Sequence, residues 1–272
     1  MSRIEATLKN VAVTGGRSLI VYVMAGDPSL EETGRIVLAI EKAGADVIEL
    51  GVPFSDPIAD GPTIQRASER ALRQGVTLRK VLDLVTGLRR QTKIPLILMS
   101  YCNPIFVFGI EAFFKEARKA GVNGVIIPDL PPEEARDFLK FARRSLIDTI
   151  FLIAPTTTSI RAEKILKVCS GFVYDVPLTG VTGSKLSGID EIKARISDLK
   201  SKTNLPVAVG FGISTPAEAE ALAETADGII VGSALVRIIE GALEDTDYLK
   251  RLANLVGSLK EAICVSGDRV ES

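Results

Sequence analysis

Eight short apolar runs, rich in valine and isoleucine, recur along the 272-residue chain, each followed by a turn and most by a helical pattern. Runs that are apolar on both faces indicate buried parallel strands covered by helices. Eight such units at this length predict an α/β fold, a single closed (β/α)8 TIM barrel that forms one domain over residues 1–272. The expected strands are Leu19–Val23, Ala45–Leu50, Ile94–Met99, Gly124–Ile127, Thr149–Ile153, Gly171–Tyr174, Leu205–Val209 and Gly228–Val231.

An open, doubly wound parallel sheet is the alternative arrangement of the same units. The first strand is not followed by a Gly-x-Gly-x-x-Gly turn, and eight units favour closure into a barrel. Two further helices are expected, one at Met1–Val13 before the first strand and a short one at Ala234–Glu240 after the eighth.

Composition narrows the class of protein. A hydrophobic fraction of 46% provides for a large core, and a formal net charge of −1 gives no strongly basic surface for nucleic acid. The longest apolar run, Leu19 to Ala25, is too short to cross a bilayer, and no basic-then-apolar signal begins the chain. Three widely spaced cysteines, Cys102, Cys169 and Cys264, are typical of a reducing compartment. We therefore expect a cytoplasmic protein without disulfides or a zinc site.

The second strand and the loop after it hold the candidate catalytic residues. Chemistry in (β/α)8 barrels lies in the loops that follow the strands, and Glu49–Gln65 carries three carboxylates among turn-forming residues. Strand alternation places Glu49 on the same face as Val47, an apolar setting that raises a carboxyl pKa. Asp60 lies in the loop and is expected to stay wetter and ionised. Two carboxylates in different environments can divide acid and base roles.

Both carboxylates also have structural interpretations. Glu49 could be an ion-pair partner at the end of a strand. Asp60 could be the N-cap of a helix that begins near Pro62. The other aspartates of these loops are assigned to turns rather than to chemistry: Asp27, Asp56 and Asp129.

Glycines end the seventh and eighth strands, where barrel enzymes often bind phosphate. Gly210–Ser214 follows the seventh strand, and Gly232 and Ser233 precede the short helix, whose first amides lack partners and carry the positive end of its dipole. Gly180 and Gly183 of the sixth loop can close over the same ligand. In the structural alternative, the glycines only form turns and Ser233 is only an N-cap.

The residues that are missing exclude several chemistries. The chain has no histidine, so it can form neither a Ser-His triad nor the histidine ligands that catalytic zinc favours. No lysine lies inside an expected strand, which disfavours a Schiff-base aldolase. Proton transfer therefore falls to carboxylates, with no metal or bound cofactor. Four aromatic residues near the strand ends could be ordinary core or could form a flat pocket for an aromatic substrate: Tyr22, Tyr101, Tyr174 and Phe211.

These motifs resemble those of the tryptophan synthase α subunit family. Glu49–Gln65 is similar to the family's signature, and the resemblance covers nearly the whole chain. It implies a (β/α)8 barrel that cleaves indole-3-glycerol phosphate, in a retro-aldol reaction, to indole and glyceraldehyde 3-phosphate. It also implies a pyridoxal-phosphate-dependent β subunit that receives the indole through a tunnel in an α2β2 complex. The other matching motifs are Ala25-Gly26-Asp27-Pro28, Tyr101-Cys102-Asn103-Pro104, Asp129-Leu130-Pro131, Ala154-Pro155-Thr156-Thr157, Thr179-Gly180-Val181-Thr182-Gly183 and Gly210-Phe211-Gly212-Ile213-Ser214.

The resemblance also implies roles by position. Glu49 is similar to the general acid/base that protonates the indole ring at C3, and Asp60 to the carboxylate that stabilises positive charge at the indole N–H. Thr182 resembles a residue of the sixth loop that hydrogen-bonds Asp60 on closure, and Tyr174 the tyrosine beside Glu49. The remaining implied substrate contacts are Tyr22 and Phe211 in the indole pocket, with Tyr101 on the same rim, and Gly183, Gly212, Gly232 and Ser233 at the phosphate.

Two regions of the sequence indicate how the chain would bind a β subunit and respond to it. The loops before Gly61 and around Pro57 resemble the surface that meets the β subunit. Before Thr179 the family usually has a small polar residue and an arginine, whereas this chain has Pro177-Leu178. The absent guanidinium removes up to five donors, so we expect a slow lyase that a partner activates by ordering its loops. The alternatives are a lyase that releases indole freely, another phosphate-binding barrel enzyme and a non-catalytic allosteric partner.

Overall fold

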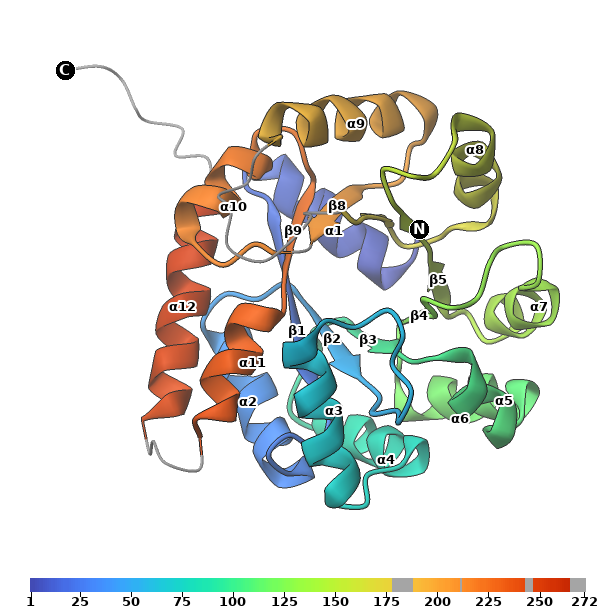
Figure 1. The fold of residues 1–272 in the computed structure, drawn as a ribbon, viewed down its shortest axis with the longest axis vertical. Coiled ribbons are helices and arrows are strands. Elements are labelled where there is room, and N and C mark those ends of the chain that lie inside the picture. Colours follow the sequence, from blue (N-terminus) through green and yellow to red (C-terminus); the bar gives the residue numbers. More distant parts are fainter. Residues whose placement is uncertain (178–187, 211, 243–246, 265–272) are drawn as a thin grey trace.

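The strands form a central parallel sheet that helices surround (Figure 1). A computed structural model describes residues 1–177, 188–210, 212–242 and 247–264. Neighbouring strands pair in the order β5-β4-β3-β2-β1-β9-β8-β7-β6. Their bounds are β1 Ser18–Met24, β2 Val47–Gly51, β3 Leu96–Met99, β4 Gly124–Ile126, β5 Asp148–Ile150, β6 Leu152–Ile153, β7 Val173–Asp175, β8 Val207–Gly210 and β9 Gly228–Val231.

The expected fifth strand is divided. Phe151 separates β5 from β6, and the two halves bond to different neighbours, β5 to β4 and β6 to β7. The Phe151 carbonyl still accepts the Tyr174 N–H at 3.2 Å. The two outermost strands of the pairing order are therefore consecutive in the chain, and the sheet closes on itself as the predicted barrel.

Helices follow the strands as expected, but two loops hold more helix than the sequence predicted. β2 is followed by both α3 and α4, and β3 by both α5 and α6. The Tyr101–Pro104 motif provides the N-cap and first turn of α5. No helix of the described part of the chain is long and apolar enough to cross a membrane. The helix bounds are α1 Arg3–Val13, α2 Leu30–Lys42, α3 Pro62–Arg73, α4 Leu78–Leu88, α5 Cys102–Phe108, α6 Ile110–Ala120, α7 Arg136–Arg144, α8 Ser159–Val168, α9 Ile189–Lys202, α10 Pro216–Ala223, α11 Ser233–Glu240 and α12 Tyr248–Ile263.

The core has two layers. The larger lies between the strands and the surrounding helices, and the smaller fills the inside of the barrel. Ile4 and Leu8, four residues apart on one face of α1, join the inner layer. Ile4 packs beside Gly124, the first residue of β4, so α1 closes the end of the barrel at which the strands begin. The opposite end, where the strands finish, is left for the candidate site.

Candidate active site

Glu49 lies inside the barrel, as strand alternation predicted. It shares the inward face of β2 with Val47 and pairs in register with Tyr22 of β1. The side chain is 1% exposed, and its Oε1 atom has no hydrogen-bond partner among the described residues. Burial away from water raises its pKa from 4.5 to about 8. Glu49 forms none of the ion pairs found in the described part of the chain, which argues against its structural interpretation.

Asp60 lies on the loop between β2 and α3 and is only half-buried. Burial raises its pKa to about 6, and a hydrogen bond with Tyr101 opposes the rise. The Tyr101 hydroxyl also accepts the N–H of Ala59 at 2.9 Å, which ties the loop to the end of β3. Phe54 packs on the Tyr101 ring, with the ring centroids 5.3 Å apart. At neutral pH Asp60 is therefore mostly ionised while Glu49 is mostly protonated, the division expected of an acid–base pair.

The N-cap alternative for Asp60 is wrong. The residue that caps α3 is Gly61, no side chain accepts a hydrogen bond from the first turn, and Pro62 occupies the first helical position. The Asp60 carboxylate therefore does not cap α3, and its side-chain hydrogen bond is with Tyr101. Ser68 of α3 fixes the other side of the loop, because its hydroxyl bonds both the N–H and the carbonyl of Phe54 at 2.9 Å.

Two tyrosines line the barrel interior near Glu49. Tyr22 and Tyr174 are buried, and the pKa of each hydroxyl is raised, first by burial and then by the nearby charges of Asp60 and Glu49. Tyr174 also belongs to the inner core layer. The alternative that this aromatic residue is ordinary core therefore applies to part of its ring. The structure thus brings Tyr22, Tyr174, Glu49 and Asp60 together at one end of the barrel, as the sequence predicted.

Two glycines shape this end of the barrel in a way that the sequence did not predict, since Gly51 had no assigned role and Gly210 was assigned only to the candidate phosphate-binding turn. A Cβ atom at Gly51 would lie 2.1 Å from the Tyr22 hydroxyl oxygen, and one at Gly210 would lie 2.9 Å from the Tyr174 hydroxyl oxygen. Each tyrosine hydroxyl therefore occupies space that a neighbouring strand leaves open only because it ends in glycine. The signal was present in the sequence, since both glycines are the last residues of their strands.

The candidate phosphate end lies at β8, β9 and α11. Gly212 adopts a positive φ of 79°, which favours glycine, and a Cβ at Gly232 would lie 3.2 Å from the Cβ of Tyr22. Gly232, not Ser233, is the N-cap of α11, so the interpretation of Ser233 as an N-cap is wrong. Gly232 has no side chain to cap α11, and no side chain of the described residues is seen to bond its first amides. Its first amides are thus available to an anion.

The neighbouring helix α10 differs in this respect. Thr215 and Glu218 form a capping box, and the Glu218 carboxylate accepts the N–H groups of Ser214 and Thr215 at 2.8 and 3.0 Å. The amides before α10 are therefore already bonded within the chain. Of these two helix starts, only that of α11 offers unbonded amides to a phosphate group.

An ion-pair network joins the loop side of the site to its phosphate side. Arg70 of α3 donates two hydrogen bonds of 2.8 Å to the fully buried carboxylate of Asp27, and a third, of 3.0 Å, to Glu240 at the end of α11. Arg66 also pairs with Glu240, at 2.7 Å. Arg70 thus fixes α3, which begins beside Asp60, relative to α11, which begins at the candidate phosphate site. The sequence had assigned Asp27 only to a turn.

Three predicted site residues, Thr182, Gly183 and Phe211, lie outside the described residues, as do Gly180 and Leu178. Within the described ranges, no group of three or more histidine, cysteine, aspartate and glutamate residues is arranged to hold a metal ion. Cys102, Cys169 and Cys264 are free thiols.

A closed parallel barrel with a proton-holding carboxyl and a second, ionised carboxylate at the carboxyl ends of its strands defines a (β/α)8-barrel enzyme. A model of the family "Tryptophan synthase alpha chain" matches residues 8–264. The chain belongs to this tryptophan synthase alpha chain family. Its sequence is 49% identical to the Geotalea uraniireducens alpha chain, over 98% of this chain and 100% of the relative. It is 46% identical to that of Aromatoleum aromaticum, over 100% and 98%. The crystal structure of the Legionella pneumophila alpha subunit superposes with a TM-score of 0.90 at 41% identity, over 97% and 98% of the two chains.

Proposed function

We propose that Glu49 and Asp60 carry out the chemistry of the family's reaction, the retro-aldol cleavage of indole-3-glycerol phosphate to indole and glyceraldehyde 3-phosphate. The chain is a lyase of the tryptophan synthase α type and acts in tryptophan biosynthesis. The observation that carries the residue assignment is the state of Glu49, a buried carboxyl inside the barrel with an unpartnered oxygen and a pKa of about 8. Such a group holds a proton at neutral pH and can transfer it to a substrate atom.

The proposed reaction begins with protonation. Glu49 gives its proton to C3 of the indole ring, and positive charge develops at the indole nitrogen, where the ionised carboxylate of Asp60 stabilises it. The bond between C3 and the glycerol chain then breaks, its electron pair returns to the indole ring, and the adjacent hydroxyl becomes the aldehyde. Glu49, now a carboxylate, accepts the proton of that hydroxyl and returns to its starting state.

The remaining residues bind and orient the substrate in this proposal. Tyr22 and Tyr174 flank the indole ring near Glu49. The amides of Gly232 and Ser233 at the start of α11 receive the phosphate, together with Gly212. Tyr101 holds the Asp60 loop in place through its bond to Ala59. Thr182, Gly183 and Phe211 complete the site in the proposal, on the resemblance alone.

The partner of the chain is a tryptophan synthase β subunit. We propose that the β subunit covers the Asp60 loop and α5, since three large apolar side chains stand exposed there, Ile58, Phe106 and Val107, at 83%, 67% and 78%. The sequence had indicated the loop around Pro57 but not α5. The bond between Ala59 and Tyr101, the N-cap of α5, joins the two segments.

Three further points belong to the proposal. The chain needs no cofactor for its own step, and pyridoxal phosphate belongs to the β subunit. The reduced state expected of its three cysteines favours the cytoplasm. The chain acts as one barrel domain, because the ends of the sheet are joined by consecutive residues around Phe151.

The test is the release of indole from indole-3-glycerol phosphate by the purified chain, alone and with a β subunit. Glu49→Gln keeps the size of the side chain and removes its proton-donating carboxyl, so we expect release to fall by about a thousandfold or more. Glu163→Gln, an exposed change of the same chemistry on α8, is the matched control.

The outcomes separate the alternatives. Release that rises with the β subunit and is lost in Glu49→Gln supports the proposed roles. Release that the β subunit leaves unchanged favours a lyase that acts alone. No release in either condition, with a β subunit that still binds, favours a non-catalytic partner.

A further inference from the structure

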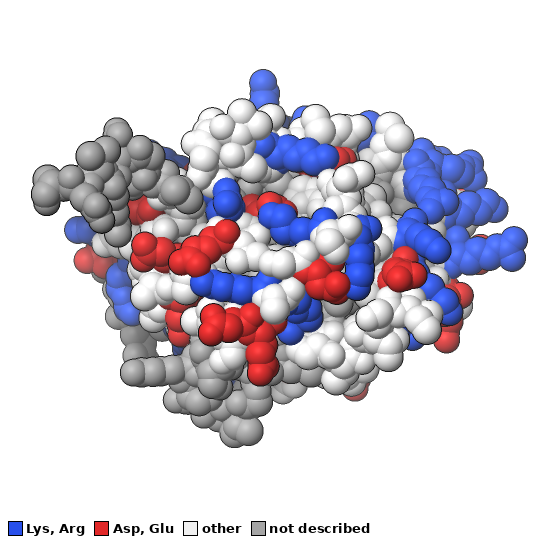
Figure 2. Space-filling view, turned by 90° about the horizontal axis from the view of Figure 1, so that it is seen from above, with Lys and Arg blue, Asp and Glu red and all other residues white. Residues whose placement is uncertain are grey.

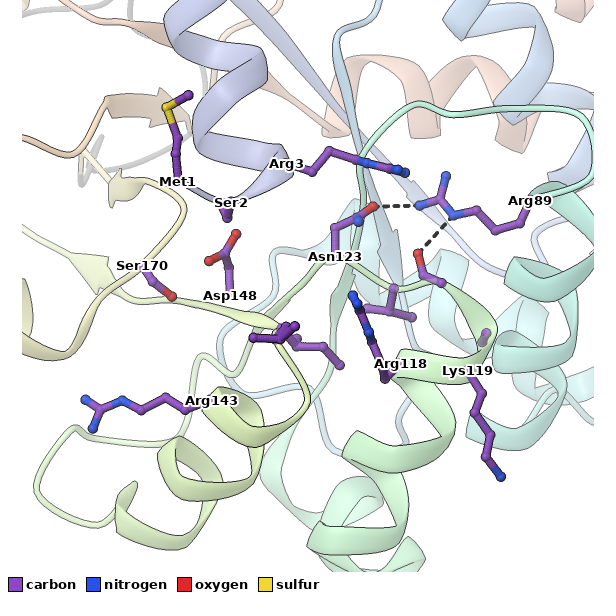
Figure 3. A pocket seen from close by; sticks show the side chains of 15 residues that line it. Met1, Ser2, Arg3, Arg89, Arg118, Lys119, Asn123, Arg143, Asp148 and Ser170 are labelled. Carbon is purple, nitrogen blue, oxygen red and sulfur yellow. Dashed lines mark hydrogen bonds between the residues drawn. The ribbon is translucent and has the colours of Figure 1, made fainter.

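A pocket lies at the end of the barrel opposite the candidate active site, where the strands begin (Figure 3). It has a volume of about 800 Å³ and lies between the start of α1, the end of α4 and the segments that lead into β4 and β5. Pockets of this size hold metabolite-sized ligands. The closing of the barrel floor by α1 keeps this pocket separate from the candidate active site.

The net charge of the chain is near zero, but its charges are unevenly distributed. Figure 2 shows lysine and arginine side chains gathered at the right-hand edge of the face it draws. Of the described residues, five lysines and arginines line the pocket, and Asp148 is the one acidic residue among them. In Figure 3 the side chains of Arg3, Arg89 and Arg118 lie around Asn123, whereas that of Lys119 points away. The pocket therefore favours an anion with more than one negative charge.

These arginines have few anionic partners within the described chain. Arg89 donates to the Gly121 and Ile94 carbonyls at 2.9 and 2.6 Å and to the Asn123 amide oxygen at 2.7 Å, all of them neutral acceptors. Burial and the charge of Arg3 lower its pKa to about 10. No described residue forms an ion pair with Arg118. Lys119 pairs with Glu116 at 2.9 Å, whereas Arg89 and Arg118 are paired with no carboxylate of the described residues.

Asp148, the first residue of β5, adds a second requirement. It is 8% exposed, and burial raises its pKa while side-chain hydrogen bonds with Ser2 and Ser170 oppose the rise. Its Oδ2 atom is buried without a hydrogen-bond partner among the described residues. Figure 3 shows its carboxyl group directed toward Ser2, within the pocket. A carboxylate only accepts hydrogen bonds, so a bare anion would leave Oδ2 unsatisfied. A ligand that suits the pocket has a hydroxyl or amino donor as well as negative charge.

We propose that this pocket binds a sugar phosphate or a similar phosphorylated polyol, whose phosphate contacts Arg3 and Arg118 and whose hydroxyl donates a hydrogen bond to Asp148. Arginine suits phosphate because its planar fork presents paired donors. An amino acid would also offer an anion and a donor, but it has no net charge, whereas the lining is strongly positive. The phosphate ester fits both observations better.

The test is isothermal titration calorimetry with ribose 5-phosphate and inorganic phosphate as probes. The Glu49→Gln chain is first saturated with indole-3-glycerol phosphate, and the heat of that step shows that the active site is filled. We expect ribose 5-phosphate still to bind, and more tightly than inorganic phosphate. Arg118→Ala should weaken both probes by about tenfold. Asp148→Asn should reduce the preference for ribose 5-phosphate without weakening inorganic phosphate.

The matched control is Arg136→Ala, which removes the same charge from an exposed position on α7 outside the pocket lining and should leave both affinities unchanged. Arg118 is itself exposed, so its replacement leaves the fold intact, and the unfolding temperature of each variant checks this. Three results would overturn the proposal: no binding of ribose 5-phosphate, binding that indole-3-glycerol phosphate abolishes, or binding that Arg118→Ala leaves unchanged.

Discussion

The burial of Glu49 has a cost in stability that depends on pH. A carboxyl whose pKa is 4.5 in the unfolded chain and about 8 in the folded one binds its proton more tightly in the folded chain. Below pH 4.5 both states are protonated and the group costs nothing. As the pH rises from 4.5 to 8, the unfolded chain ionises first and gains stability relative to the folded one. The penalty is about 3 kcal/mol at pH 7 and reaches about 5 kcal/mol above pH 8.

Glu49→Gln removes this titration and keeps the shape of the side chain. We therefore expect the variant to be more stable than the natural chain by about 3 kcal/mol at pH 7, with a difference that vanishes near pH 4. The assay is urea unfolding followed by circular dichroism at several pH values between 4 and 9. Glu163→Gln, exposed on α8, should change the free energy of unfolding by less than about 0.5 kcal/mol at every pH. A gain for Glu49→Gln that is equal at pH 5 and pH 8 would refute the reasoning.

Three other predictions follow from the same contacts. The kcat/KM of the lyase should rise with pH around an apparent pKa of about 6 and fall around one of about 8, because the active form pairs ionised Asp60 with protonated Glu49. In a stopped-flow pH profile, Asp60→Asn should remove the rise at the acid side. Arg70→Ala leaves the buried Asp27 carboxylate unpaired and should cost about 3 to 5 kcal/mol in urea unfolding, of which Arg70→Lys should recover part. Ile58→Ser should weaken β-subunit binding in calorimetry while the melting temperature of the isolated chain stays constant; equal affinity for the two chains would contradict the proposed interface.

Periodicity and composition predicted the barrel because the number and spacing of the apolar runs indicate the fold strongly. All eight apolar runs contain strand, and the last, Gly228–Val231, has the expected bounds. The alternation that placed Glu49 beside Val47 is also local, so it could be derived from the sequence without knowledge of the fold. The general position of Asp60 followed from the rule that barrel loops carry the chemistry.

The errors have a common physical origin in contacts distant in sequence. The division of the fifth strand at Phe151 depends on which neighbour each half bonds, and a single strand's sequence does not contain that information. The loop that holds Asp60, just before the Gly61 N-cap of α3, is held by the Tyr101 hydroxyl, 42 residues from the Ala59 amide that it binds. The anchoring of Asp27 by Arg70 likewise joins residues 43 positions apart.

The fit between Tyr22 and Gly51, and between Tyr174 and Gly210, sets a rule for redesign of this site. Because each hydroxyl fills the space of an absent side chain on the adjacent strand, the packing at this end of the barrel is fixed by residue pairs rather than by single residues. A smaller residue at Tyr22 alone would leave the space beside Gly51 empty, and a larger residue at Gly51 alone would clash with the Tyr22 hydroxyl. Substrate range in this barrel is therefore best explored by changing both members of a pair together. A smaller residue on one strand is then matched by a larger residue on its neighbour, and the packing density is kept.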